Sequence, residues 1–88
     1  MADSRYAVEL KQSARKELER LPNDLIARII VKLESLEENP RPAGCKKLKG
    51  GDAEYRIRVG EYRIVYLIDD RRSTVTVSRI RHRRDVYE

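Results

Sequence analysis

The sequence predicts an α+β fold in which a helical hairpin packs on one face of a mainly antiparallel sheet. Apolar residues recur at helical spacing through residues 25–36. Three later segments are rich in Ile, Val and Tyr and alternate between apolar and polar residues, as strands do. The chain has 88 residues, enough for one modest core, so we expect a single domain over residues 1–88. The predicted order is strand, helix, helix, strand, strand, strand.

The first half of the chain is expected to supply one strand and two helices. Residues 5–10 alternate, which predicts a short strand with its apolar side chains on one face. Ser13 is a suitable N-cap for a short helix. A second helix is expected to begin after Pro22 and to end near Asn39, because Pro40 disfavours helical backbone at the preceding residue.

The second half is expected to be a loop followed by three antiparallel strands. Residues 40–52 contain two Pro and three Gly, which predicts a loop. Residues 54–59 and 62–69 form the first two strands, separated only by Gly60 and Glu61. A Gly at the first central position is what a type II′ hairpin turn requires. Residues 74–80 form the last strand, and residues 81–88 a basic tail.

A two-residue hairpin loop fixes the register of the two strands that it joins. Arg58 then lies opposite Arg63, and Arg56 points to the same side, away from the apolar face that receives the helices. Like charges directly opposite each other are destabilising by up to about 1 kcal/mol. Because an arginine fork binds two phosphate oxygens at once, this cluster favours a polyanionic ligand. The alternative is a solvated sheet face whose arginine stems cover apolar neighbours.

The charge distribution favours the same kind of ligand. Residues 1–44 carry eight basic and eight acidic side chains, whereas residues 45–88 carry twelve and seven, so the whole net charge of +5 lies in the second half. A basic half is typical of proteins that bind nucleic acid. The sequence shows no metal-ligand spacing, and we expect neither a metal nor another cofactor. The single Cys45 and the absence of a signal peptide or apolar span predict a cytoplasmic protein that does not bind membranes.

Further basic and aromatic residues extend the candidate surface. The loop contains Lys46, Lys47 and Lys49, which are suited to clamping a phosphate backbone or are ordinary loop charges. The tail holds Arg81, His82, Arg83 and Tyr87, where the tyrosine could stack on a base or transfer a proton. The alternative for the tail is a solvated charge run.

Residues 48–50, 55–66 and 80–87, which end in His82-Arg83-x-x-Val86-Tyr87, resemble the RelE/ParE family of type II toxins. The order, spacing and length agree, so the resemblance covers nearly the whole chain. It implies a RelE-like, microbial ribonuclease-like fold and a cognate antitoxin that wraps the toxin. For the RelE branch it implies a metal-free endoribonuclease that cleaves mRNA in the ribosomal A site and thereby inhibits translation.

The same resemblance implies roles for individual residues. The catalytic set would be Arg58, Arg63, Arg83 and Tyr87, with Arg81 as a competing assignment to Arg83. Apart from the resemblance, we expect contacts to RNA from basic residues of the loop, the sheet and the tail, namely Lys46, Lys47, Lys49, Arg56, Arg81 and His82. Arg56 and Arg58 stand where the best-known RelE toxin has lysine. Arginine effectively cannot lose its proton, so neither residue is suited to act as a general base.

Two other functions stay open at this point. ParE-type toxins share the fold and much of the Tyr-Arg-x-x-Tyr strand, so the chain could be a non-enzymatic inhibitor of DNA gyrase. The basic tail that ends in Tyr87 favours the RelE type. A third possibility is an inactive toxin that only binds RNA.

Overall fold

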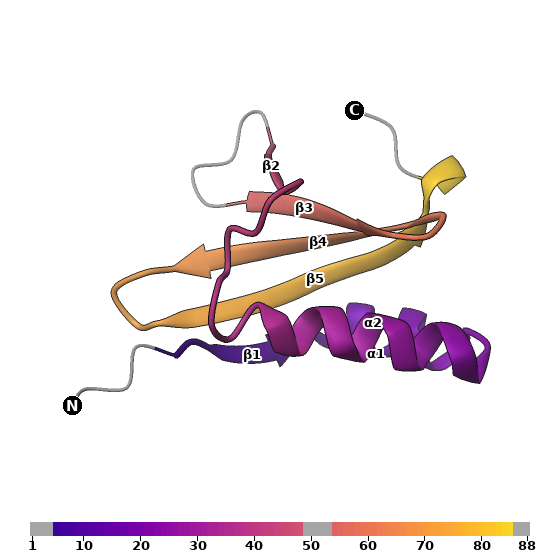
Figure 1. The fold of residues 1–88 in the computed structure, drawn as a ribbon. Coiled ribbons are helices and arrows are strands. Elements are labelled where there is room, and N and C mark those ends of the chain that lie inside the picture. Colours follow the sequence, from indigo (N-terminus) through magenta and orange to yellow (C-terminus); the bar gives the residue numbers. More distant parts are fainter. Residues whose placement is uncertain (1–4, 49–53, 86–88) are drawn as a thin grey trace.

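A computed structural model describes residues 5–48 and 54–85 (Figure 1). One strand and two helices come first and are followed by four strands and a 3₁₀ turn. The elements are β1 (Ala7–Leu10), α1 (Gln12–Glu19), α2 (Asn23–Ser35), β2 (Lys46–Lys47), β3 (Glu54–Val59), β4 (Tyr62–Asp69), β5 (Thr74–His82) and the turn Arg83–Asp85. The predicted α+β fold class, with the helices packed against a mainly antiparallel sheet, is confirmed.

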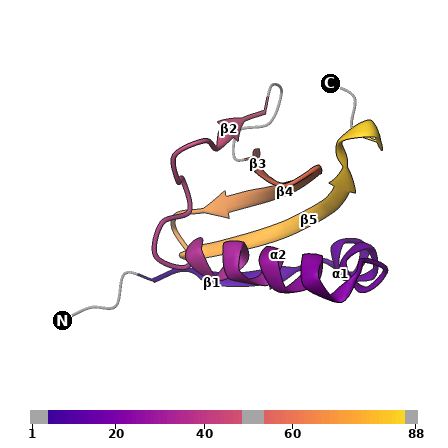
Figure 2. The same cartoon turned by 45° about the vertical axis from the view of Figure 1, so that its right-hand side comes forward.

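The strands form one five-stranded sheet in the order β1-β5-β4-β3-β2. The strands from β2 to β5 pair antiparallel with their neighbours, and β1 lies parallel beside β5. The first strand of the chain therefore pairs with the last. Figures 1 and 2 show the resulting twisted sheet, with β5 between β1 and β4.

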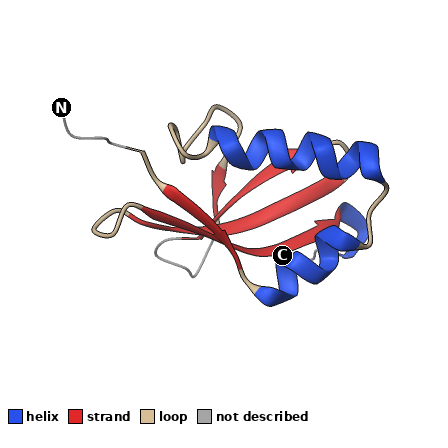
Figure 3. Ribbon diagram, turned by 90° about the horizontal axis from the view of Figure 1, so that it is seen from below, coloured by secondary structure: helices blue, strands red, loops and turns tan. Residues whose placement is uncertain are grey.

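The hydrophobic core lies between the helices and one face of this sheet. Figure 3 shows α2 lying along the strands and α1 near the end of the sheet. α1 packs against β5 and β1, whereas α2 packs against β3. The periodic apolar residues of both helices meet the alternating residues of the strands. The buried residues are Ala14, Leu18, Ile29, Leu33, Leu36, Ile57, Val59, Ile64, Tyr66, Ile68, Val75, Val77 and Ile80.

Tyr66 shows how a polar atom is accommodated in this core. Its ring is fully buried, and its hydroxyl donates a 2.8 Å hydrogen bond to the backbone oxygen of Pro40. Burial raises the pKa of the Tyr66 hydroxyl above its ordinary value. The hydrogen bond anchors the segment that follows α2 against the sheet.

The β3–β4 hairpin has the predicted bounds and register. Val59 pairs with Tyr62, and Arg58 pairs with Arg63. Gly60 has a φ of 59°, while Glu61 is not among the residues with positive φ, as a type II′ turn requires.

Several boundaries differ from the expectation. The first strand is shorter, and Ser13 lies inside α1, where its hydroxyl donates to the backbone oxygen of Ser78 instead of capping the helix. α2 ends at Ser35, with Leu36 as its C-cap, before the predicted end near Asn39. Part of the predicted loop forms strand β2, and β5 continues through His82. Among the described residues, no helix has the length and apolar character needed to cross a membrane.

Candidate nucleic-acid interface

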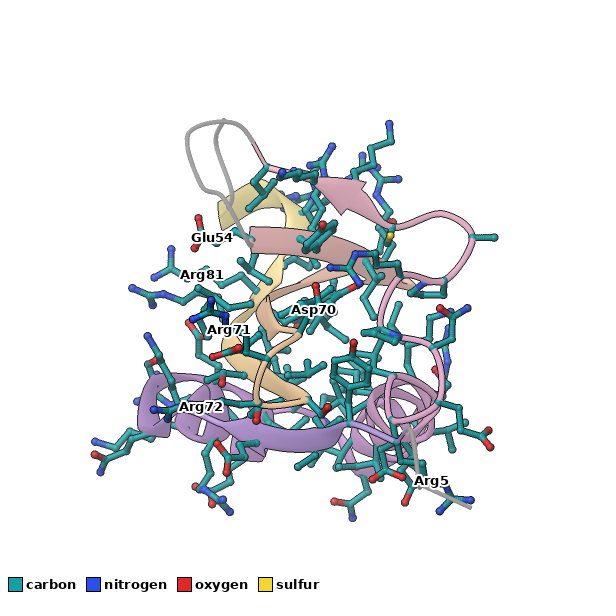
Figure 4. All side chains as sticks on the ribbon, turned by 90° about the vertical axis from the view of Figure 1, so that its left-hand side faces the viewer. Arg5, Glu54, Asp70, Arg71, Arg72 and Arg81 are labelled. Carbon is teal, nitrogen blue, oxygen red and sulfur yellow. The ribbon has the colours of Figure 1, made fainter. Side chains whose placement is uncertain are left out.

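Three arginines from three adjacent strands form a row across the sheet. Arg58 of β3 pairs with Arg63 of β4, and Arg63 in turn pairs with Arg81 of β5. Cross-strand partners point to the same face, so the three side chains share the face opposite the buried core. Figure 4 shows Arg81 on this side together with Glu54, which lies on the same face of β3 as Arg58. We call these three residues the arginine row.

The residues of the row differ in exposure. Arg58 is exposed, whereas Arg63 in the centre is half-buried and its Nε atom is shielded from solvent. The side chain of Arg81 is 40% exposed. The central arginine therefore has its Nε atom below the surface, between the exposed Arg58 and the partly exposed Arg81.

A β-bulge places Arg81 in the row. Val65 pairs with Arg79 and Tyr66 pairs with Val77, so Ser78 is an extra residue in β5. The Ser78 hydroxyl donates a 3.2 Å hydrogen bond to the backbone oxygen of Val65. An extra residue reverses the alternation of the strand beyond it. Without it, Arg79 and Arg81 would follow Val75 and Val77 toward the helices.

A second basic row runs beside the first. Lys46 of β2 pairs with Arg56, Arg56 pairs with Val65, and Val65 pairs with Arg79. Lys46, Arg56 and Arg58 help to line a cavity of about 260 Å³ on the β2–β3 side of the sheet. Lys47 pairs with Tyr55 and, because side chains alternate, points away from this face. Lys49 lies outside the described residues.

An acidic residue that sequence reasoning missed lies at the end of the arginine row. Glu17 of α1 accepts hydrogen bonds from Arg81 Nε at 3.0 Å and from Arg79 Nη1 at 3.3 Å. Its other carboxylate oxygen accepts the backbone N–H of Ile80 at 2.8 Å. More than 60 residues separate Glu17 from these partners in the sequence, and no local pattern indicates the contact.

The residues after Arg81 turn away from the sheet. Arg83 is the first residue of the 3₁₀ turn. Its backbone N–H donates to the backbone oxygen of Glu61 at 2.8 Å, and its Nε lies 3.3 Å from the carboxylate of the same residue. Arg83 is thus held at the hairpin turn and not in the arginine row. Tyr87 lies outside the described residues.

His82 occupies the opposite face of β5 from Arg81. Its ring meets Tyr62 edge-to-face, with centroids 5.3 Å apart, and its Nδ1 accepts the backbone N–H of Arg84 at 3.2 Å. A neutral His82 therefore carries its proton on Nε2. His82 and Tyr62 line a cavity of about 550 Å³ whose wall also includes Glu17 and Arg81.

The surface has the chemistry of a site that binds anions. Guanidinium groups keep their charge at all physiological pH values and donate in pairs to phosphate oxygens. Within residues 5–48 and 54–85, no three His, Cys, Asp or Glu side chains come together as metal ligands would. The surface can therefore bind a phosphate and stabilise negative charge that develops on it.

A separate cluster fixes the other end of the sheet. Arg41 donates to both carboxylate oxygens of Asp70, at 3.3 and 2.9 Å, and stacks over the Tyr55 ring. The Tyr6 hydroxyl donates to the same carboxylate at 2.6 Å. The hydrogen bonds from Arg41 and Tyr6 hold the pKa of Asp70 below its usual value. This cluster ties the N-terminal segment to the loop after α2 and to the β4–β5 turn.

Comparison with known proteins places this architecture in a family. Residues 8–87 match the family model described as the ParE toxin of type II toxin–antitoxin systems, parDE. The chain is 32% identical to RelE1 of Methanocaldococcus jannaschii, over 96% of this chain and 97% of that protein. It is 31% identical to toxin RelG of Mycobacterium tuberculosis, over 93% and 95% of the two chains.

A solved structure agrees with this assignment. The archaeal RelE–RelB complex from Pyrococcus horikoshii contains a chain that superposes with a TM-score of 0.81 and 26% identity, covering 92% of this chain and 98% of that one. Sequence, fold and length thus agree over nearly the whole molecule. The chain belongs to the RelE/ParE family of toxins of type II toxin–antitoxin systems.

Proposed function

We propose that this chain is a RelE-type toxin that cleaves mRNA in the ribosomal A site and so arrests translation. The observation that carries the proposal is the arginine row on the sheet face opposite the core. Neighbouring strands lie about 4.8 Å apart, so the three backbone positions span roughly 10 Å. Long arginine side chains anchored at that spacing can converge on one phosphate or bridge to the next.

In the proposed reaction the ribose 2′-oxygen attacks the adjacent phosphorus, and the bond from phosphorus to the 5′-oxygen of the next nucleotide breaks. Arg58 and Arg63 stabilise the added negative charge on the pentavalent transition state. Arg81 contacts the scissile phosphate, since it lies in the row and Arg83 does not. Lys46 and Arg56 hold the neighbouring backbone.

The arginine row offers no side chain that could accept the proton of the 2′-hydroxyl. Arginine cannot serve as a base, and Nδ1 of His82 already accepts a hydrogen bond from the Arg84 N–H. Tyr87 is the candidate from the tail for proton transfer or for stacking on a base. We therefore expect weak cleavage of free RNA and a strong dependence on the ribosome, which would orient the 2′-hydroxyl for in-line attack.

A cognate antitoxin is part of the same proposal. The similar Pyrococcus chain was solved as a RelE–RelB complex. A partly disordered acidic segment that folds on binding would complement the basic sheet face of this chain. Such a segment would compete with RNA for the arginine row.

Gyrase inhibition is the second candidate, because the matching family model is that of ParE toxins. An in vitro translation assay run beside a gyrase supercoiling assay separates the two functions. We expect the protein to stop translation and to leave supercoiling unchanged. Inhibited supercoiling with normal translation would establish the ParE-type function instead, and no effect in either assay would favour a module that only binds RNA.

The same assays test the surface. Arg63→Ala removes the centre of the arginine row and is expected to abolish inhibition of translation. Arg72→Ala is the matched control, because it removes an exposed arginine from the turn that precedes β5, whereas Arg81 lies near the end of that strand. Equal activity of the two variants would rule out the arginine row as the site.

A further inference from the structure

Glu17 is the one acidic side chain that the structure places directly on an arginine of the row among the described ion pairs. Only 21% of its side chain is exposed, so the contact is shielded from solvent on most sides. One carboxylate oxygen contacts Arg81 and Arg79, and the other accepts the N–H of Ile80 between them. Three donors from one stretch of β5 thus converge on a single carboxylate.

The sheet topology explains why a side chain is needed at this place. β1 pairs with β5 only from Thr74 to Val77, so β5 extends beyond its partner on that edge. α1 follows β1 and packs against the uncovered part of β5. A strand edge without a partner leaves backbone N–H groups unsatisfied, and the Glu17 carboxylate satisfies that of Ile80.

The electrostatics of the row explain why that side chain is acidic. Arg63 and Arg81 are cross-strand neighbours, and Arg79 lies two residues from Arg81 on the same face. Their mutual repulsion favours rotamers that spread the guanidinium groups apart. A carboxylate that binds both Arg79 and Arg81 offsets the repulsion between these two arginines, and its contact with Nε restrains the Arg81 guanidinium.

We propose that Glu17 is a positioning residue that holds Arg81 in the geometry needed to contact the scissile phosphate. The inference rests on the proposed endoribonuclease function and adds to it a residue from α1, outside the basic surface. Glu17 does not touch RNA. It acts through Arg81, so its removal is expected to lower kcat and to leave KM nearly unchanged, because the other basic residues still bind the message.

The informative substitution is Glu17→Gln. The glutamine side-chain oxygen can still accept the Ile80 N–H, so the edge of β5 and the melting temperature should be retained. The charge that holds Arg81 is lost. We expect kcat for cleavage of ribosome-bound mRNA to fall about 10- to 100-fold, as misplacement of a catalytic group commonly produces. Glu19→Gln, an exposed neighbour in the same helix, is the matched control and should cleave like the wild type.

A double-mutant cycle separates positioning from a purely structural role. If Glu17 acts through Arg81, the double variant Glu17→Gln/Arg81→Ala should cleave no more slowly than Arg81→Ala alone. Additive losses would overturn the inference, and so would a Glu17→Gln variant with wild-type kcat. In either of those cases the wild type still cleaves and the proposed function stands. Absence of cleavage by the wild type would overturn both.

Discussion

Arg81 and Arg83 lie close together in the sequence but have different surroundings in the structure. Arg81 and Arg83 are both basic residues near the end of the chain, yet one lies in the arginine row and the other is tied to Glu61 at the hairpin turn. The sequence left their assignment open because only one residue separates them. The pairing of Arg63 with Arg81 places Arg81 in the row, and for this reason we propose Arg81 as the phosphate contact.

A first prediction follows for these two residues. Arg81→Ala is expected to lower kcat for ribosome-dependent cleavage at least about 100-fold, because it removes a charged donor from the transition state. Arg83→Ala should cost less than about tenfold, since its guanidinium pairs with Glu61 at the edge of the surface. Single-turnover cleavage on programmed ribosomes measures both. A larger loss for Arg83→Ala would reverse the assignment.

The ion pair between Arg41 and Asp70 predicts a pH dependence of stability. The pKa of Asp70 is lower in the folded chain than in the unfolded chain, so its contribution is fully present above about pH 4 and is lost as the pH falls through the folded value. Asp70→Asn should therefore be less stable than the wild type at pH 7 and should approach it toward pH 3. Urea midpoints across this range measure the difference. The exposed Glu34→Gln is the control, and a wild-type advantage that persists unchanged at pH 3 would contradict the prediction.

The sequence predicted a contact between residues that are close together along the chain, but not one between residues that are far apart. The opposition of Arg58 and Arg63 followed from the two-residue hairpin loop and is confirmed. The contact of Glu17 with Arg81 was beyond reach, because it depends on how α1 packs beside β5.

At the scale of elements, the hairpin and the bulge together build the site. The II′ turn sets the register of β3 and β4, and the extra residue Ser78 turns the end of β5 so that Arg79 and Arg81 face away from the core. The turn was predictable from Gly60 and Glu61. The bulge was not, since it is stabilised by contacts of Ser78 with Val65 and Ser13, both distant in sequence. Strand β2 was missed because two consecutive lysines carry no strand pattern.

The turn supplies a third prediction. Gly60 has a positive φ of 59°, and a Cβ added there would meet the Arg28 guanidinium only at an ordinary 3.5 Å. The cost of Gly60→Ala therefore comes from the backbone and should be about 1–2 kcal/mol of unfolding free energy. Gly60→Asn should cost less, because asparagine is among the residues favoured after glycine where a type II′ turn has a positive φ. Denaturant titration measures both, and an Ala variant as stable as the wild type would show that the turn adopts another conformation.

At the scale of the whole molecule, one face of the sheet is apolar and buried, and the other is basic and carries the proposed site. One face receives α2 and forms the core, which α1 closes beside β5 (Figure 3), so it needs the apolar alternation that made the fold predictable. The other face carries the arginine row and the second basic row, at the end of the sheet near the β3–β4 turn. The likeness to RelE-named toxins covers both faces, since it extends over nearly the full length of each chain.

Primer extension on mRNA from cells that express the protein tests the central claim most directly. If the arginine row cleaves messages on the ribosome, new 5′ ends should appear within translated reading frames. They should disappear both in the Arg63→Ala variant and when translation initiation is blocked. Growth arrest by the wild type without any new 5′ ends would contradict the proposed ribonuclease function.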